Sequence, residues 1–175
     1  MIIVMSFAQT LFEDGQSQSL VAGELLFVVG QRVRSVYLVT EGLIELVRHS
    51  ESGNRMVLFR ARSEQILAEA SAYSDAYHCD GIAASNACVS FVPVETFRSK
   101  LALDVELAKV WSAKLAHSLQ LARLQSEIRG LRTVAERLDA WLDDKPLPPK
   151  GEWQRVAQEL GVSREALYRE LAKRR

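Results

Sequence analysis

The sequence predicts an α+β protein in which a β-sandwich or β-barrel is followed by helices. Between residues 20 and 100, short apolar runs alternate with glycines at close intervals, a pattern typical of an all-β unit. The stretch from about residue 95 to Leu142 contains no proline, and the only glycine in this stretch is Gly130. After three further prolines, the last residues have the pattern of two short helices joined by a tight turn.

The expected strands are short and rich in branched and aromatic residues. The stretch Glu51-Ser52-Gly53-Asn54, between two of them, has good turn chemistry. Because the strands are short and glycines separate them at close intervals, a sandwich or barrel is favoured over βαβ units. The expected strand ranges are 25–29, 36–39, 43–47, 56–59 and 89–92.

Composition excludes several classes of protein. The chain has 175 residues and carries 22 Lys and Arg against 22 Asp and Glu, so its formal net charge is zero. Its 48% of hydrophobic residues excludes a disordered or collagen-like chain. No apolar run reaches the roughly 18 residues of a membrane span, so we expect no membrane partner. Residues 1–5 are too short for a signal peptide, and Cys79 and Cys88 form no CxxC motif, which together indicate a cytoplasmic protein with reduced thiols.

The region from residue 101 to 145 has a heptad-like apolar seam on a long helix. Two of its positions are polar, and two interpretations have equal weight: the helix packs on its own domain, or it also pairs with a second copy of itself. The seam consists of Leu107, Val110, Lys114, His117, Leu121, Leu124, Ile128 and Leu131.

A linker with three prolines, residues 143–151, leads into the last unit, residues 146–175, in which two helices are expected. Gly161 can end the first helix in a left-handed conformation, and Ser163 is a good N-cap for the second. The second helix is expected to bury Leu167 and Leu171. The apolar face of the first helix consists of Trp153, Val156, Ala157 and Leu160.

The opposite face of the second helix is polar, which gives the pattern of a helix-turn-helix that reads the major groove of double-stranded DNA. Arginine suits the paired acceptors of guanine, and glutamate accepts from the cytosine amino group. Residues 146–175 hold seven basic and four acidic residues, which supports this interpretation. The alternative is a two-helix cap with a solvated charged face. This face consists of Glu165, Tyr168, Arg169 and Ala172, with Arg164 at its border.

An enzyme is not expected, because the three histidines are scattered and no metal triad, nucleophile elbow or phosphate loop occurs.

Four segments resemble the Crp/Fnr family of bacterial transcription regulators, across nearly the whole chain. They are residues 23–30 (GELLFVVG), 37–46 (YLVTEGLIEL), 67–71 (LAEAS) and 161–169 (GVSREALYR). The resemblance implies a cyclic-nucleotide-binding-like jelly roll in residues 1–100, a dimerisation helix and following helix in 101–145, and a helix-turn-helix in 146–175.

The resemblance also implies a homodimer that pairs through the seam and binds a near-palindromic DNA site. Arg164, Glu165 and Arg169 then correspond to the family's base readers, and Ser163 to the cap and a phosphate contact. Tyr168 belongs to the same expected DNA-binding set. RNA polymerase is a candidate partner for a regulator of this class.

The expected ligand-binding positions, Ala68, Glu69, Ala70, His78 and Cys79, depart from the family's phosphate-binding cassette. Ala68 replaces a glycine, Glu69 is kept, and His78 and Cys79 take the places of an arginine and a serine or threonine. Neutral histidine is a poor substitute for a permanent cation, so we expect weak or no cyclic-AMP binding and no cofactor. Haem ligation through His78 and Cys79 is a remote alternative.

The second departure is at the end of the chain, where the family continues into a β-hairpin wing and this sequence stops at Arg175. We expect the wing's phosphate contacts to be absent, Glu170 to be solvated, and the basic residues 173–175 to contact phosphates instead. An alternative function follows: a sensor or interaction module that no longer reads DNA and acts through dimerisation or a protein partner.

Overall fold

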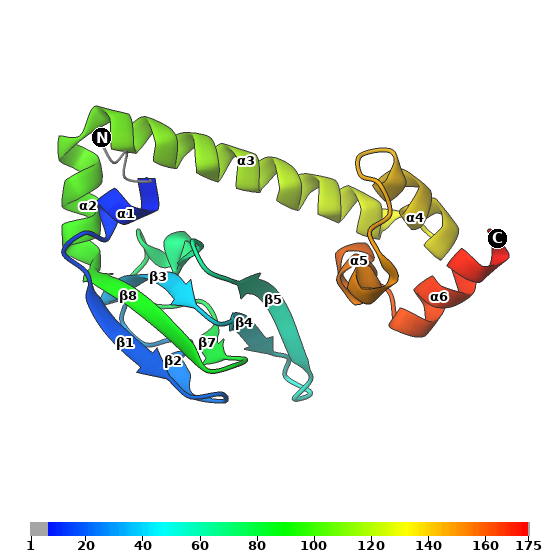
Figure 1. The fold of residues 1–175 in the computed structure, drawn as a ribbon, viewed down its shortest axis with the longest axis horizontal. Helices are drawn as coiled ribbons and strands as arrows, with labels where there is room; N and C mark the ends of the chain where they lie inside the picture. The colour runs from blue at the N-terminus through cyan, green and yellow to red at the C-terminus, as the bar shows by residue number, and fades with distance from the viewer. Residues whose placement is uncertain (1–6, 175) are drawn as a thin grey trace. The chain divides into compact units, whose positions relative to one another are not determined.

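An antiparallel jelly roll followed by a series of helices makes up the α+β fold (Figure 1), in a computed structural model that describes residues 7–174. The chain divides into two compact units, of which the first ends at Trp111 and the second begins at Ser112. The predicted fold class is therefore confirmed. Within residues 7–174, none of the helices combines the length and apolar character needed to cross a bilayer.

The jelly roll has two four-stranded antiparallel sheets, and all five expected strands are present. The first sheet has the order β1 (Gln16–Leu20), β8 (Ala87–Pro93), β3 (Ser35–Glu41) and β6 (Ile66–Leu67). The second has the order β2 (Leu25–Phe27), β7 (Asp80–Ala83), β4 (Ile44–His49) and β5 (Arg55–Ala61).

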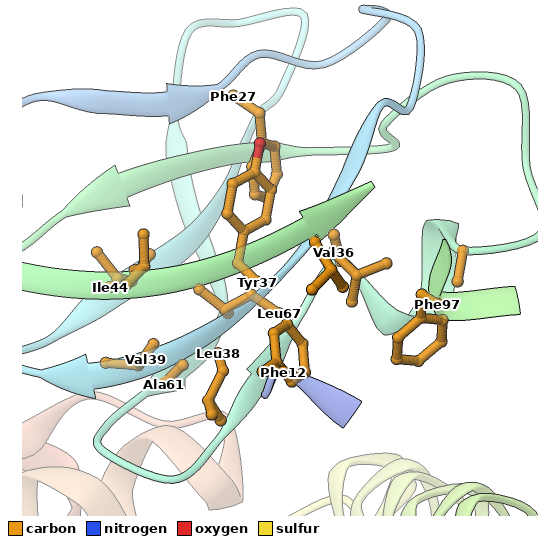
Figure 2. Close-up of a cluster of buried hydrophobic side chains, with 14 of the residues drawn as sticks. Phe12, Phe27, Val36, Tyr37, Leu38, Val39, Ile44, Ala61, Leu67 and Phe97 are labelled. Atoms are coloured by element: carbon orange, nitrogen blue, oxygen red, sulfur yellow. The ribbon is translucent and has the colours of Figure 1, made fainter. Parts of the chain in front are cut away.

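The core of the first unit lies between the two sheets, where side chains from both meet (Figure 2). The Phe27 ring stacks on Tyr37 at 5.5 Å and on Tyr77 at 4.3 Å between centroids. Tyr77 belongs to the loop between β6 and β7, so this stack fixes that loop against the sheets. The fully buried residues of the core include Val36, Val39, Ile44, Leu67, Val89 and Phe97.

Two helices close one end of the roll. The helix α1 (Phe7–Leu11) precedes β1, and α2 (Val94–Leu103) follows β8. Phe97 of α2 contacts Phe12 at 6.3 Å and lies edge-on to Trp111 at 5.1 Å between ring centroids. Burial of these aromatic rings joins the helices to the core of the first unit.

The helical region consists of separate helices, because side chains cap the chain at two breaks. After α2, the extended residue Asp104 accepts hydrogen bonds from the amides of Glu106 and Leu107, which begins α3 (Val105–Gly130). After α3, Thr133 and Glu136 form a reciprocal capping box that begins α4 (Val134–Leu142). The short 3-10 helices η1 and η2 span Glu69–Ser71 and Lys150–Glu152.

The second unit has its own apolar core, formed by the end of α3, by α4, and by α5 (Trp153–Leu160) and α6 (Arg164–Lys173). The predicted apolar face of the first terminal helix is confirmed, since Trp153, Val156, Ala157 and Leu160 are all buried. Leu167 and Leu171 of α6 are buried as expected. The other buried members of this core are Ile128, Leu138 and Trp141.

Candidate functional site

The turn between α5 and α6 fixes the geometry of the helix pair. Gly161 has a φ of 65°, in the left-handed region, as the sequence predicts. The amide of Val162 donates to the carbonyl of Ala157 at 2.9 Å, which closes the end of α5. A Cβ at position 161 would also lie 3.2 Å from the Arg129 side chain, so two requirements favour glycine here.

Two arginines from upstream helices satisfy the last carbonyls of α5. Arg129, at the end of α3, donates to the carbonyls of Gln158 and Glu159 at 2.9 and 3.2 Å. Arg137 of α4 donates to the carbonyls of Leu160 and Gly161 at 3.2 and 3.3 Å. These cations lie at the negative end of the α5 dipole, where positive charge is stabilising. Sequence reasoning missed both residues.

The start of α6 is capped by Ser163, whose Oγ accepts a hydrogen bond from the amide of Ala166 at 3.1 Å. In the first turn, the backbone amide of Glu165 and the Ser163 hydroxyl hold the pKa of the Glu165 carboxyl below its ordinary value, and Arg164 adds to this effect. Glu165 is therefore a carboxylate, and thus a hydrogen-bond acceptor, across the neutral pH range.

The predicted reading face of α6 is largely open. Arg164, Glu165 and Arg169 are exposed, whereas Tyr168 is half-buried against Trp153. Within residues 7–174, Arg164 and Arg169 form no salt bridge. Other cations of this unit are engaged: salt bridges are formed by Lys145, Arg155, Lys173 and Arg174.

The expectation that Glu170 is solvated is wrong. Its side chain is only 14% exposed and pairs with Arg174 at 3.1 Å and with Lys173 at 3.6 Å. Arg174 also pairs with Asp139 of α4 and donates to the carbonyl of Ala135, so it ties α6 to α4. Lys173 and Arg174 are therefore engaged within the protein, and Arg175 lies outside the described residues.

In the first unit, the expected ligand-binding positions lie on η1 and at the end of the loop that follows it. Ala68 is buried and has a φ of 64°, the left-handed conformation that glycine adopts without strain. The backbone here thus keeps a glycine-like shape although the residue has a Cβ. Ala70 is exposed on η1.

Glu69 is a partly buried acid of this region. Its Oε2 is buried and has no hydrogen-bond partner among the described residues. Burial raises the pKa of the Glu69 carboxyl above its ordinary value. An unpaired buried acceptor is costly, so this oxygen suits a hydroxyl donor.

His78 and Cys79 have different surroundings. The imidazole Nδ1 of His78 lies 2.9 Å from the Oγ of buried Ser71, and the residue is otherwise exposed. Cys79 is 1% exposed, and burial, with Asp80 nearby, raises the pKa of its thiol. Iron ligation by this pair would need a thiolate, which these surroundings disfavour.

The seam of α3 is packed at its two ends, where residues are buried or partly buried, and is exposed at its centre. Leu107 packs against the core of the first unit, whereas Leu124 and Ile128 pack in the core of the second. Every residue from 112 to 123 is exposed. The exposed seam residues are Val110, Lys114, His117 and Leu121.

The jelly roll defines the class to which the first unit belongs. A family model described as the cyclic nucleotide-binding domain matches residues 17–104. The chain belongs to this family. Among curated proteins, no sequence match was found.

Solved structures share the fold over most of the chain. FixK2 from Bradyrhizobium japonicum is 19% identical, with a TM-score of 0.69 over 91% of this chain and 83% of that chain. The c-di-GMP responsive global regulator CLP of Xanthomonas campestris is 19% identical, with a TM-score of 0.64 over 95% of this chain and 89% of that chain. The catabolite activator protein of Thermus thermophilus is 20% identical, with a TM-score of 0.61 over 98% of this chain and 83% of that chain.

The name of this family implies a cyclic nucleotide as the ligand. The residues present here fit the sugar of such a ligand but not its phosphate. The unpaired Oε2 of Glu69 suits a sugar hydroxyl. At the other end, His78 offers no permanent positive charge to a phosphate. The guanidinium of Arg48 is nearby, but its Nε donates to the His78 carbonyl at 3.1 Å.

Proposed function

We propose that the protein is a homodimeric, sequence-specific DNA-binding transcriptional regulator of the Crp/Fnr type, whose sensor domain does not bind cyclic AMP. The observation that carries the proposal is the open face of α6. There Arg164, Glu165 and Arg169 are exposed on a helix that Ser163 caps, beyond a glycine turn. Arginine and glutamate in this position suit the base edges of the major groove.

The dimer is proposed from the exposed centre of α3. A helix that is exposed on all sides for three turns is marginal in water, because little apolar surface is buried along it. Pairing of two seams would cover Val110 and Leu121, which are 41% and 38% exposed. A dimer would also present two copies of α6 to one DNA duplex.

Selection of bound DNA from a random pool tests the proposal. We expect enrichment of a two-fold symmetric motif. Glu165→Ala should relax the preference at one base pair in each half-site, whereas Glu51→Ala, at an exposed position in the β4–β5 turn, should leave the motif unchanged. Absence of any enriched motif would overturn the proposal and support the alternative of an interaction module without DNA recognition.

The cyclic-AMP part of the proposal has a separate test. Millimolar cyclic AMP should not shift the melting temperature of the protein, because position 78 offers no permanent cation to the phosphate. The double variant Ala68→Gly/His78→Arg, which brings back the family's residues, should gain a shift. A clear shift of the unmodified protein at micromolar nucleotide would contradict this part.

A further inference from the structure

Tyr168 lies where three side chains from different segments meet. Its ring is edge-on to Trp153 of α5, at 5.0 Å between centroids. The guanidinium carbon of Arg164 lies 5.2 Å from the ring centroid, and the Nζ of Lys150 lies 6.0 Å from it. Both cations are thus within the range of a cation–π contact with one ring.

The two cations at this ring lack the ion pairs that several other cations of the second unit form. Neither Lys150 nor Arg164 forms a salt bridge with any described residue. By contrast, Lys145 pairs with Glu159, and Arg155 pairs with Glu152 and Glu159. The ring therefore gathers positive charge that the protein itself leaves available for an anionic partner.

The segment that carries Lys150 is held in place by the same aromatic pair. The indole Nε1 of Trp153 donates to the carbonyl of Pro148 at 2.9 Å, and Pro149 precedes η2 with its φ fixed near −53°. Lys150 thus follows a stiff stretch that is bonded to α5. Its position depends on Trp153 and, through the ring contact, on Tyr168.

We propose that Tyr168 is a positioning residue that holds Arg164 for a base edge and Lys150 for a DNA phosphate. This inference rests on the proposed function. Arg164 lies one helical turn before Tyr168, so its long side chain runs alongside the ring. A guanidinium that is already oriented loses less freedom when it binds guanine with two hydrogen bonds.

Two substitutions of Tyr168 separate the ring's electrostatic role from its packing. Tyr168→Phe keeps the aromatic ring face, whereas Tyr168→Leu keeps an apolar side chain but removes the aromatic ring. On the selected motif, we expect Phe to bind like the unmodified protein and Leu to bind about five-fold more weakly. The Leu variant should also lose preference at the base pair that Arg164→Ala identifies. Equal binding by Leu and Phe would overturn the role of the ring.

A double variant tests whether Tyr168 acts through Arg164. If it does, the double variant Arg164→Ala/Tyr168→Leu should lose less binding than the sum of the two single losses, because the part of the Tyr168 effect that acts through Arg164 is already absent and only the part that acts through Lys150 remains. Fully additive losses would contradict the proposal. Melting temperatures of the four proteins should be measured alongside, so that a folding defect is recognised.

The role of Lys150 is tested through salt dependence. Lys150→Gln should weaken binding to all sequences alike and lower the salt slope by about two, one contact per subunit of a dimer. The matched control is Lys145→Gln, because Lys145 pairs with Glu159 and should contribute little. An unchanged slope for Lys150→Gln would remove Lys150 from the proposed surface.

One measurement without DNA separates this inference from the proposed function. The Nε–Hε resonance of Arg164 should carry a ring-current shift that Tyr168→Phe keeps and Tyr168→Leu removes. If no DNA motif is selected but this shift behaves as expected, the proposed function fails and the ring contact stands. If a motif is selected but the Tyr168 variants match the unmodified protein, only the inference fails.

Discussion

Ala68 has a backbone conformation that is strained for alanine but almost free of strain for glycine. Its φ of 64° brings the Cβ close to the following carbonyl, a strain of about 1–2 kcal/mol. Ala68→Gly should therefore stabilise the protein by about 0.5–1 kcal/mol after the greater chain entropy of glycine is subtracted. Chemical denaturation measures the change. Ala70→Gly, at an exposed position without a positive φ, should destabilise instead, and stabilisation by both would contradict the explanation.

Glu69 should make the stability of the protein depend on pH. Burial raises its pKa in the folded state, so the folded protein binds a proton more readily than the unfolded chain does. The loss of stability from the ionised, buried Glu69 carboxyl is complete above the pKa of the folded state. It disappears as the pH falls toward 4.5, the ordinary pKa of glutamate. Glu69→Gln should raise the melting temperature at neutral pH, with a gain that shrinks on acidification. Exposed Glu51→Gln is the control, and a gain that is constant with pH would exclude this explanation.

At the scale of single residues, local chemistry was predictable and distant partners were not. Gly161 and Ser163 were identified because a left-handed turn and an N-cap depend on residues within one helical turn. Glu170 was misjudged because its partner Arg174 turns back onto Asp139, 35 positions away. For the same reason, the sequence does not reveal the hydrogen bonds of Arg129 to the end of α5, nor that the buried Oε2 of Glu69 has no partner among the described residues.

Among the helices, the side chain of Arg137 links α4 to the end of α5. Arg137 of α4 donates to the carbonyl of Leu131 at 2.9 Å, in addition to the two carbonyls at the end of α5. Arg137→Met should leave these acceptors without their charged donor and destabilise the protein by about 1.5–3 kcal/mol, measured by chemical denaturation. The matched control is Arg132→Met, at an exposed position. Similar losses in both variants would contradict the capping role.

The elements that the sequence does not reveal are those with little apolar character of their own. The strand β1, QSQSL, buries only Leu20 and exists because its backbone pairs with β8 from Gln16 to Leu20. The strand β7 is four residues long and includes Gly81. By contrast, the Thr133 capping box follows a recognisable pattern, T-x-x-E, that marks the start of a helix.

For the whole molecule, the exposed stretch of α3 leads to a prediction about oligomeric state. Leu121→Glu places a charge in the proposed seam, so we expect it to convert the proposed dimer into a monomer in analytical ultracentrifugation. Leu119→Glu is the matched control, because Leu119 lies on another face of the same turns and is 52% exposed. Loss of the dimer in both variants, or in neither, would contradict the seam.

The exposed turns of α3 also bear on how such a protein would respond to its own abundance. If two chains must meet before either seam is covered, assembly is second order in the chain. Below the dissociation constant, the amount of DNA-competent species then rises with the square of the amount of protein. A doubling of synthesis would give a four-fold increase in active species, so the amount of active species would change more steeply than the amount of protein.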